Sequence, residues 1–280
     1  MAVLACTPHP GLDTVSVRRG ALVQVVDLAT CRETERRAGL RRAFVVPGLA
    51  TRGQSLVYRG RTLFTERLRG NPVLPLALSP DRRWALFAVD RFGSLSILVD
   101  GLPVRIVSTR GGATRTLPVT LPDPQYTTWC GGKLVLTAGD GRIAWQNKRL
   151  LVTGAPTWRV RPLVDAPRRA WGASACAPDG RSVVVQSQPE SDAYSFFAGA
   201  WALWRVRLDG RAAQLTHPPK GYVDESPRYA RDGTLYFVRS RRGHGSLYAL
   251  RSGKVVGPLL SLGYLLGFYG KRDWPYSVAG

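Results

Sequence analysis

The sequence has few of the residues and none of the motifs that most catalytic sites require. Its 280 residues include only three histidines, His9, His217 and His244. It also lacks the G-x-S-x-G, H-E-x-x-H, P-loop and G-x-G-x-x-G patterns. Without a G-x-S-x-G elbow the chain does not carry the hydrolase half of a peptidase, and we expect no catalytic residue.

Residues that could hold a metal ion are scarce as well. The four cysteines have no C-x-x-C spacing, which argues against a zinc site. Calcium prefers several oxygen ligands, but the sequence has only two asparagines, and its acidic residues are scattered. We therefore expect neither a metal nor another cofactor.

No apolar run is long enough to span a bilayer. The longest, residues 257–270, is too short and too rich in glycine for a transmembrane helix, and we interpret it as an inner strand near the end of the fold. The opening residues MAVLAC loosely resemble the end of a lipoprotein signal, but a basic start and most of an apolar run are missing. Either the chain is cytoplasmic or the given sequence starts late, and we favour the late start.

Lysine is rare, although the formal net charge is +21. Of the 40 basic residues only five are lysines, and the arginines are scattered along the chain, often as doublets. Together with the scarcity of asparagine, this composition resembles a high-GC coding bias. A dedicated nucleic-acid binder concentrates its basic residues on one face, so nucleic acid is not the expected partner.

What the sequence does contain is a phrase that recurs. It reads LSPDRRWALF at 78–87, TWCGGKLVLT at 128–137, CAPDGRSVVV at 176–185 and YARDGTLYFV at 229–238. With Asp81, Gly131, Asp179 and Asp232 as reference points, the steps are 50, 48 and 53 residues. Asp-Gly between β-rich runs predicts a tight hairpin, and a preceding proline ends the strand because it has no N–H to donate. We therefore expect the three aspartates to be turn residues.

A period near 50 residues built from short strands predicts an all-β fold, a β-propeller of four-stranded antiparallel blades. We expect a single domain of six blades, with five or seven as alternatives. Their approximate limits are 13–38 together with 259–280, 39–70, 71–121, 122–163, 164–216 and 217–258. The C-terminal segment would pair with the N-terminal blade and close the ring, which removes exposed sheet edges. Residues 31–37 are expected as an outer strand, with a short helix as the alternative.

The recurring phrase resembles that of the TolB-like propellers, whose repeat centres on W-S-P-D-G-x-x-I-A-F. The resemblance covers roughly residues 71–258 and is closest at 215–250, where LTHPP precedes ESPRYARDGTLYFV. It implies a secreted or periplasmic protein, and many proteins of this family act as binding scaffolds. Similar propellers also gate the active sites of prolyl-oligopeptidase-type peptidases. The chain departs from the motif at Arg82, Arg231 and Gly131, and none of these departures identifies a ligand.

One candidate binding region is a polar cluster at the start of an inner strand. It consists of Tyr222, Asp224, Glu225, Arg228 and Tyr229. Residues at this place in a propeller tend to face the mouth of the central channel, where partners bind. A local acid–arginine pair that only anchors the loop is the simpler interpretation.

A second candidate is the tract 186–197, which is longer than a hairpin needs. It presents the aromatic residues Tyr194, Phe196 and Phe197. Long irregular loops on a rigid scaffold often carry binding. An insertion without a role would give the same pattern.

The even number of cysteines permits two disulfides in an oxidising compartment. Cys130 and Cys176 lie near the same hairpin in consecutive repeats, so they could approach each other between neighbouring blades. Cys6 and Cys31 would tie the N-terminus to the first repeat. Four buried thiols are the alternative.

The sequence thus predicts a monomeric, non-catalytic propeller in the cell envelope or outside the cell, which binds a protein or a small ligand at its channel mouth. Two other functions stay open. A lyase or hydrolase would use His217 or His244 with an acid that converges on it in the channel. An arginine-rich binder of polyanions or nucleic acid would present one continuous basic face. A cytoplasmic location also stays open.

Overall fold

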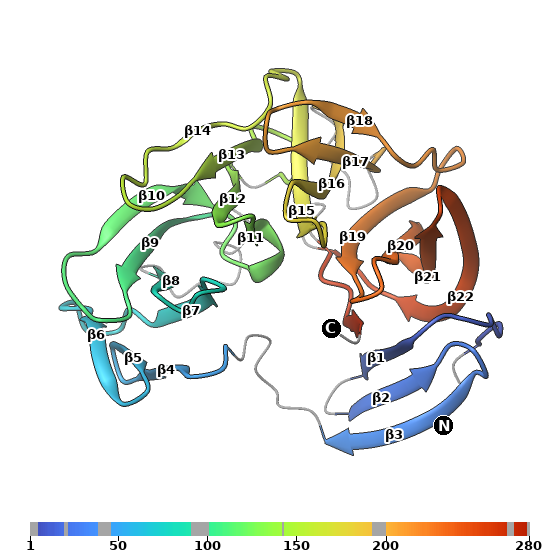
Figure 1. Ribbon diagram of the computed structural model, residues 1–280, viewed down its shortest axis with the longest axis horizontal. Coiled ribbons are helices and arrows are strands. Elements are labelled where there is room, and N and C mark those ends of the chain that lie inside the picture. The colour runs from blue at the N-terminus through green and yellow to red at the C-terminus, as the bar shows by residue number, and fades with distance from the viewer. Residues whose placement is uncertain are drawn as a thin grey trace.

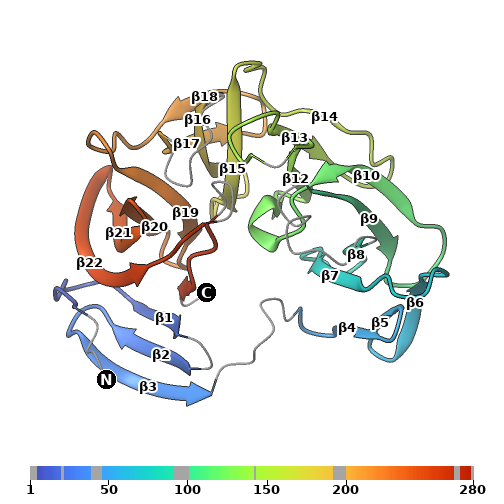
Figure 2. The same cartoon turned by 180° about the vertical axis from the view of Figure 1, so that it is seen from behind.

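The computed structural model describes residues 5–19, 22–38, 46–90, 101–141, 143–191, 200–267 and 272–278. Within these ranges the chain consists of antiparallel β-strands and one short 3₁₀ helix, Pro124–Tyr126. The sheets are set around a common centre, and their strands step from the inside to the outside (Figures 1 and 2). This arrangement is that of a β-propeller.

The N-terminal third contains two sheets. In one, the order is β23 (Tyr276–Val278), β1 (Thr14–Arg19), β2 (Leu22–Asp27) and β3 (Arg32–Ala38). The other is three-stranded, with β4 (Leu49–Arg52), β5 (Ser55–Tyr58) and β6 (Arg61–Thr65). Residues 32–38 therefore form an outer strand, and the helix alternative is wrong.

The middle of the chain forms one larger sheet from two runs of strands. The first run is β7 (Val73–Leu78), β8 (Trp84–Val89), β9 (Leu102–Ser108) and β10 (Arg115–Thr120). The second is β11 (Thr127–Cys130), β12 (Lys133–Ala138), β13 (Arg149–Thr153) and β14 (Arg161–Pro162). Between the runs, β10 pairs with β12 only at Thr120 and Ala138.

Two four-stranded meanders follow. One is β15 (Arg169–Cys176), β16 (Ser182–Pro189), β17 (Ala202–Arg207) and β18 (Ala212–Gln214). The other is β19 (Val223–Tyr229), β20 (Leu235–Arg241), β21 (His244–Arg251) and β22 (Lys254–Tyr264). The strand β22 continues to Tyr264, beyond the expected limit at residue 258.

The described part of the apolar run 257–270 does not form an inner strand. Its described beginning belongs to β22, the last strand of its meander, and the backbone of Cys6 bridges to Leu260 there. Leu259, Leu260 and Leu262 are buried in a cluster with residues of β1 and β2. The run is apolar because the N-terminal segment covers it, a contact that local sequence does not reveal.

The turn after each inner strand explains the recurring phrase. The Oδ1 atoms of Asp81, Asp179 and Asp232 accept hydrogen bonds from the backbone N–H two residues further on, at 3.1, 2.8 and 2.8 Å. The Ser79 hydroxyl also donates to Asp81, and this bond holds the pKa of that carboxyl below its usual value. These carboxylates shape turns and are engaged locally.

The departures from the phrase have different physical consequences. Gly131 has a φ of +53°, and a Cβ there would lie 2.2 Å from the carbonyl oxygen of Gly180 in the neighbouring turn, so only glycine fits. Arg82 stands where the other three turns have glycine, and it also adopts a positive φ, 56°. A side chain in this region is strained by about 1 kcal/mol.

The core lies between neighbouring sheets. One cluster joins Val15 and Val17 of β1 to Tyr236 and Leu247 of the last meander. Further clusters join β4–β6 to β7–β9, β8 to β12, β12–β13 to β15–β17, and β16–β17 to β20. In the cluster that joins β8 to β12, Trp84 and Trp129 both contact the buried Trp158 edge to face, with ring centroids 4.9 and 6.1 Å away.

All four cysteines are in disulfides. Cys130 at the end of β11 is bonded to Cys176 at the end of β15, with their Cα atoms 5.2 Å apart. Cys6 is bonded to Cys31, with a Cα separation of 5.8 Å. The first bond ties consecutive inner strands together, and the second ties the N-terminal segment to the β2–β3 turn. A lipid anchor on Cys6 would need the sulfur that this second bond uses.

In the described part of the chain, no helix has the length and apolar character that crossing a bilayer would require.

Candidate functional site

The inner strand β19 sends two adjacent carboxylates to different partners. Its pairing with β20 shifts register between Glu225 and Arg228, which is a β-bulge. Ser226 lies inside this bulge with a φ of 54°, in the left-handed region that serine rarely adopts. Its N–H donates to Oε1 of Gln186 on the neighbouring meander at 3.0 Å. The bulge re-aims the side chains that follow it.

Asp224 forms an ion pair within its own meander. Arg239 on β20 donates from Nε to Oδ1 at 2.7 Å and from Nη2 to Oδ2 at 2.9 Å. The Asp224 carboxylate is fully buried, whereas 13% of the Arg239 side chain is exposed. This carboxylate raises the pKa of the Arg239 guanidinium. Asp224 therefore holds β19 against β20.

Glu225 instead binds the C-terminal segment 272–278. The Nη1 atom of Arg272 lies 3.2 Å from Oε2, and the indole N–H of Trp274 donates to Oε1 at 2.8 Å. The Ser240 hydroxyl adds a third donor, at 2.7 Å from Oε1. Glu225, Arg272 and Trp274 are all at least 95% buried. A buried carboxylate with this many donors fixes the C-terminal segment inside the ring.

Tyr276 provides a second attachment of the same segment. Its hydroxyl donates to the carbonyl oxygen of Ser226 in the bulge. Burial raises the pKa of the Tyr276 phenol above its usual value, so the hydroxyl stays protonated and can donate. Beyond it, β23 pairs with β1, with Tyr276 opposite Val17. The C-terminal segment thus connects β19 to β1.

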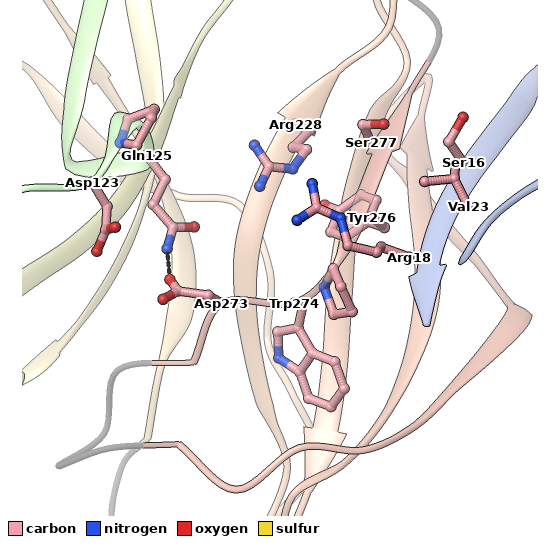
Figure 3. Close-up of a pocket in the computed structure, with 12 residues that line it drawn as sticks. Ser16, Arg18, Val23, Asp123, Gln125, Arg228, Asp273, Trp274, Tyr276 and Ser277 are labelled. Carbon is pink, nitrogen blue, oxygen red and sulfur yellow. Dashed lines mark hydrogen bonds between the residues drawn. The ribbon is translucent and has the colours of Figure 1, made fainter. Parts of the chain in front are cut away.

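A pocket of about 370 Å³ lies against this segment. Four separate parts of the chain line it: β1 and β2, the residues before β11, β19, and the C-terminal segment. The lining residues used below are Arg18, Asp123, Gln125, Arg228, Asp273 and Tyr276 (Figure 3). Its volume is within the range of small-ligand sites.

Charged groups of both signs face the pocket. In Figure 3, Asp123, Gln125 and Asp273 lie on one side, and the guanidinium groups of Arg18 and Arg228 lie on the other. The side-chain amide of Gln125 donates to Asp273. The Arg228 guanidinium lies 5.2 Å from the ring centroid of Tyr276, which is cation–π geometry.

Of the residues that the sequence singled out, Arg228 lines this pocket. Asp224 and Glu225 form the buried ion pairs described above, and the pocket lining does not include them. Tyr222 packs against Arg241, whose guanidinium lies 5.5 Å from its ring, and Tyr229 is half-buried against other blades. Tyr194, Phe196 and Phe197 lie outside the described residues.

Most pocket residues were missed by sequence reasoning. Arg18, Asp123, Gln125, Asp273 and Tyr276 come from segments that carry no copy of the recurring phrase. The one indication in the sequence was the C-terminal segment 259–280, which is expected to pair with the N-terminal blade and close the ring.

The histidines that could serve an enzyme lie elsewhere. His217 is exposed, with its Nδ1 atom 3.2 Å from the amide of Gln214, and His244 is exposed against the ring of Tyr264. Neither lines the pocket. Across the described ranges, no three His, Cys, Asp or Glu side chains gather in a way that could hold a metal ion.

The arginine doublets are also far apart in the fold. They lie on β1, in the β7–β8 turn, at the start of β15 and in the β20–β21 turn; Arg41 and Arg42 are outside the described residues.

No protein-family model and no curated protein matches the chain. Among solved structures, a puromycin hydrolase is similar with a TM-score of 0.54 and 14% identity, over 91% of this chain and 45% of that one. TolB from Acinetobacter baumannii has a TM-score of 0.45 and 14% identity, over 91% and 53%. A streptogramin B lyase has a TM-score of 0.48 and 10% identity, over 90% and 81%. The chain spans about half the length of the first two, and at these identities the likeness concerns the fold alone.

Proposed function

We propose that the chain is a six-bladed TolB-like propeller closed by its own C-terminus. Each of the four later runs of strands, from β7 to β22, contains four strands. The strands β4–β6 form a reduced blade, and β1–β3 form another that borrows β23 as its fourth strand. Pairing of the two chain ends would hold the ring together without an exposed inner edge.

We propose further that this propeller is a non-catalytic, monomeric scaffold that binds a protein or small ligand at its centre. The observation that carries this proposal is the pocket, which three distant parts of the chain build together with a C-terminal segment fixed by Glu225. Its polar groups are arginine, aspartate, glutamine, serine and tyrosine side chains, a set suited to recognition. Both candidate catalytic histidines are exposed and outside it.

The two disulfides support a location in the cell envelope or outside the cell. Such bonds persist in oxidising compartments and are rare in the cytosol. Intact-mass measurement of natively produced protein, with and without reduction, tests this proposal. A gain of four hydrogens on reduction would support it, and four free thiols before reduction would contradict it.

The binding role is tested by screening short peptides and small metabolites against the immobilised full chain. The screen compares wild type with Arg228→Ala and Arg231→Ala. Arg231 is exposed in the β19–β20 turn, so its variant loses the same charge outside the pocket. We expect ligands whose affinity falls at least tenfold with Arg228→Ala and is unchanged with Arg231→Ala. Mass spectrometry should recover these ligands chemically unchanged. Chemically altered ligands would overturn the non-catalytic role, and no pocket-dependent ligand would overturn the scaffold role.

A further inference from the structure

Two arginines contribute positive charge to the lining of the pocket. Among the described residues, neither Arg18 nor Arg228 forms an ion pair, although both are half-buried. The Nε atom of Arg228 is buried and has no hydrogen-bond partner. A guanidinium does not lose its proton in proteins, so partial burial without a partner costs free energy. An incoming anion would recover that cost.

The C-terminal segment holds the Arg228 side chain and the Arg18 backbone before any ligand binds. The Tyr276 ring lies against the Arg228 guanidinium, and the Tyr276 hydroxyl is bonded to the bulge in β19. The backbone N–H of Arg18 donates to the carbonyl oxygen of Pro275 at 2.7 Å. Preorganisation of the Arg228 guanidinium and of the strand that carries Arg18 raises affinity.

The other side of the pocket requires a hydrogen-bond donor. The Oε1 atom of Gln125 is buried without a hydrogen-bond partner, while its amide nitrogen donates to Asp273. Asp123 and Asp273 add carboxylate acceptors on this side. A ligand N–H or ammonium group would satisfy the Gln125 oxygen and face the two acids.

The buried Gln125 oxygen distinguishes between kinds of anion. A dianion such as phosphate would gain from the arginines but brings no N–H for this oxygen. A carboxylate that carries a nitrogen donor nearby would be favoured on both sides. The volume of about 370 Å³ suits one or two amino-acid residues.

We propose that this pocket binds an α-amino carboxylate, either a free amino acid or the C-terminal residue of a peptide. Its carboxylate is received by Arg18 and Arg228, and its nitrogen donors face Gln125 and Asp273. This inference rests on the proposed binding function and names the chemistry of its ligand.

The test is calorimetric titration of the full chain with four kinds of probe. These are free amino acids, acetylated dipeptides with a free carboxylate, the same dipeptides as C-terminal amides, and inorganic phosphate. We expect the amides and phosphate to bind at least tenfold more weakly than the best carboxylate. Arg18→Ala and Arg228→Ala should each lower the affinity for the carboxylate at least tenfold. Arg228→Lys should lower this affinity less, because lysine keeps the charge although it lacks the planar guanidinium fork. Arg19→Ala, an exposed neighbour outside the pocket, should bind as wild type does.

The outcomes separate the two sources of carboxylate and the two proposals. Binding of free amino acids assigns a small-molecule ligand, and binding of dipeptides alone assigns a peptide C-terminus. Amides or phosphate that bind as well as carboxylates would overturn the inference. If no probe binds but the library screen yields Arg228-dependent ligands of other chemistry, the inference fails and the scaffold function stands. If neither experiment yields a ligand, both fail. Thermal unfolding of each variant verifies that it is folded.

Discussion

Asp224 and Glu225 are neighbours on one strand, and both are fully buried acids paired with arginine. Asp224 binds Arg239, which is 15 residues away in the same meander. Glu225 binds Arg272, which is 47 residues away and on the segment that returns to β1. Successive side chains of a strand point to opposite faces, so one pair stabilises a blade and the other positions the C-terminal segment and the pocket.

The largest effect is expected from Glu225→Ala. The change removes the buried carboxylate that accepts from the Arg272 guanidinium and the Trp274 indole, so we expect a loss of about 3–5 kcal/mol in the free energy of unfolding. Urea denaturation measures it, and hydrogen exchange should show early opening of residues 272–278. A loss below about 1 kcal/mol would contradict the role assigned to Glu225.

Asp224→Ala should cost less, about 2 kcal/mol, because the partly exposed Arg239 can turn towards water. Its guanidinium also keeps its contact with the Tyr248 ring, 5.1 Å away. The same urea experiment applies. Protection of residues 272–278 should stay at the wild-type level, and early exchange there would mean that the two ion pairs are not independent.

Tyr276→Phe sharpens the comparison by removing only the second attachment of the C-terminal segment. The Ser226 carbonyl loses its donor, and we expect about 1 kcal/mol of destabilisation. The ring against Arg228 remains, so the pocket should still bind its ligand. An effect as large as that of Glu225→Ala would show that Tyr276, not Glu225, is the main anchor.

The smallest effect at neutral pH comes from the ionisation of the buried tyrosines, which affects stability only in alkali. Burial raises the pKa of Tyr236 to about 12, and it raises that of Tyr276 above the ordinary value as well. The unfolded chain releases these protons near pH 10 while the folded chain retains them, so stability falls as pH rises from about 10 to 12. Melting temperatures between pH 8 and 11 test this, and the slope should be shallower in Tyr236→Phe and Tyr276→Phe. An unchanged slope in both variants would assign the alkaline loss to other groups.

Local sequence was informative wherever local chemistry decides the structure. The aspartates of the recurring phrase predict hairpin turns, and the structure has turns there. The apolar run 257–270 misled because burial in a fourth strand, under a distant N-terminal segment, has the same composition as burial in an inner strand. Of the cluster 222–229, Arg228 is the member that lines the pocket, because side-chain direction and the bulge decide which residues of this strand reach it.

By itself the sequence determined an all-β repeat, its turns and the absence of common catalytic motifs, because these depend on backbone preferences that act over a few residues. Only the tertiary structure decided which acid holds a blade and which holds the C-terminal segment. It also decided that Arg18, Gln125 and Arg228 share one pocket. Those outcomes depend on contacts between residues from 15 to more than 200 positions apart, and no local pattern encodes them.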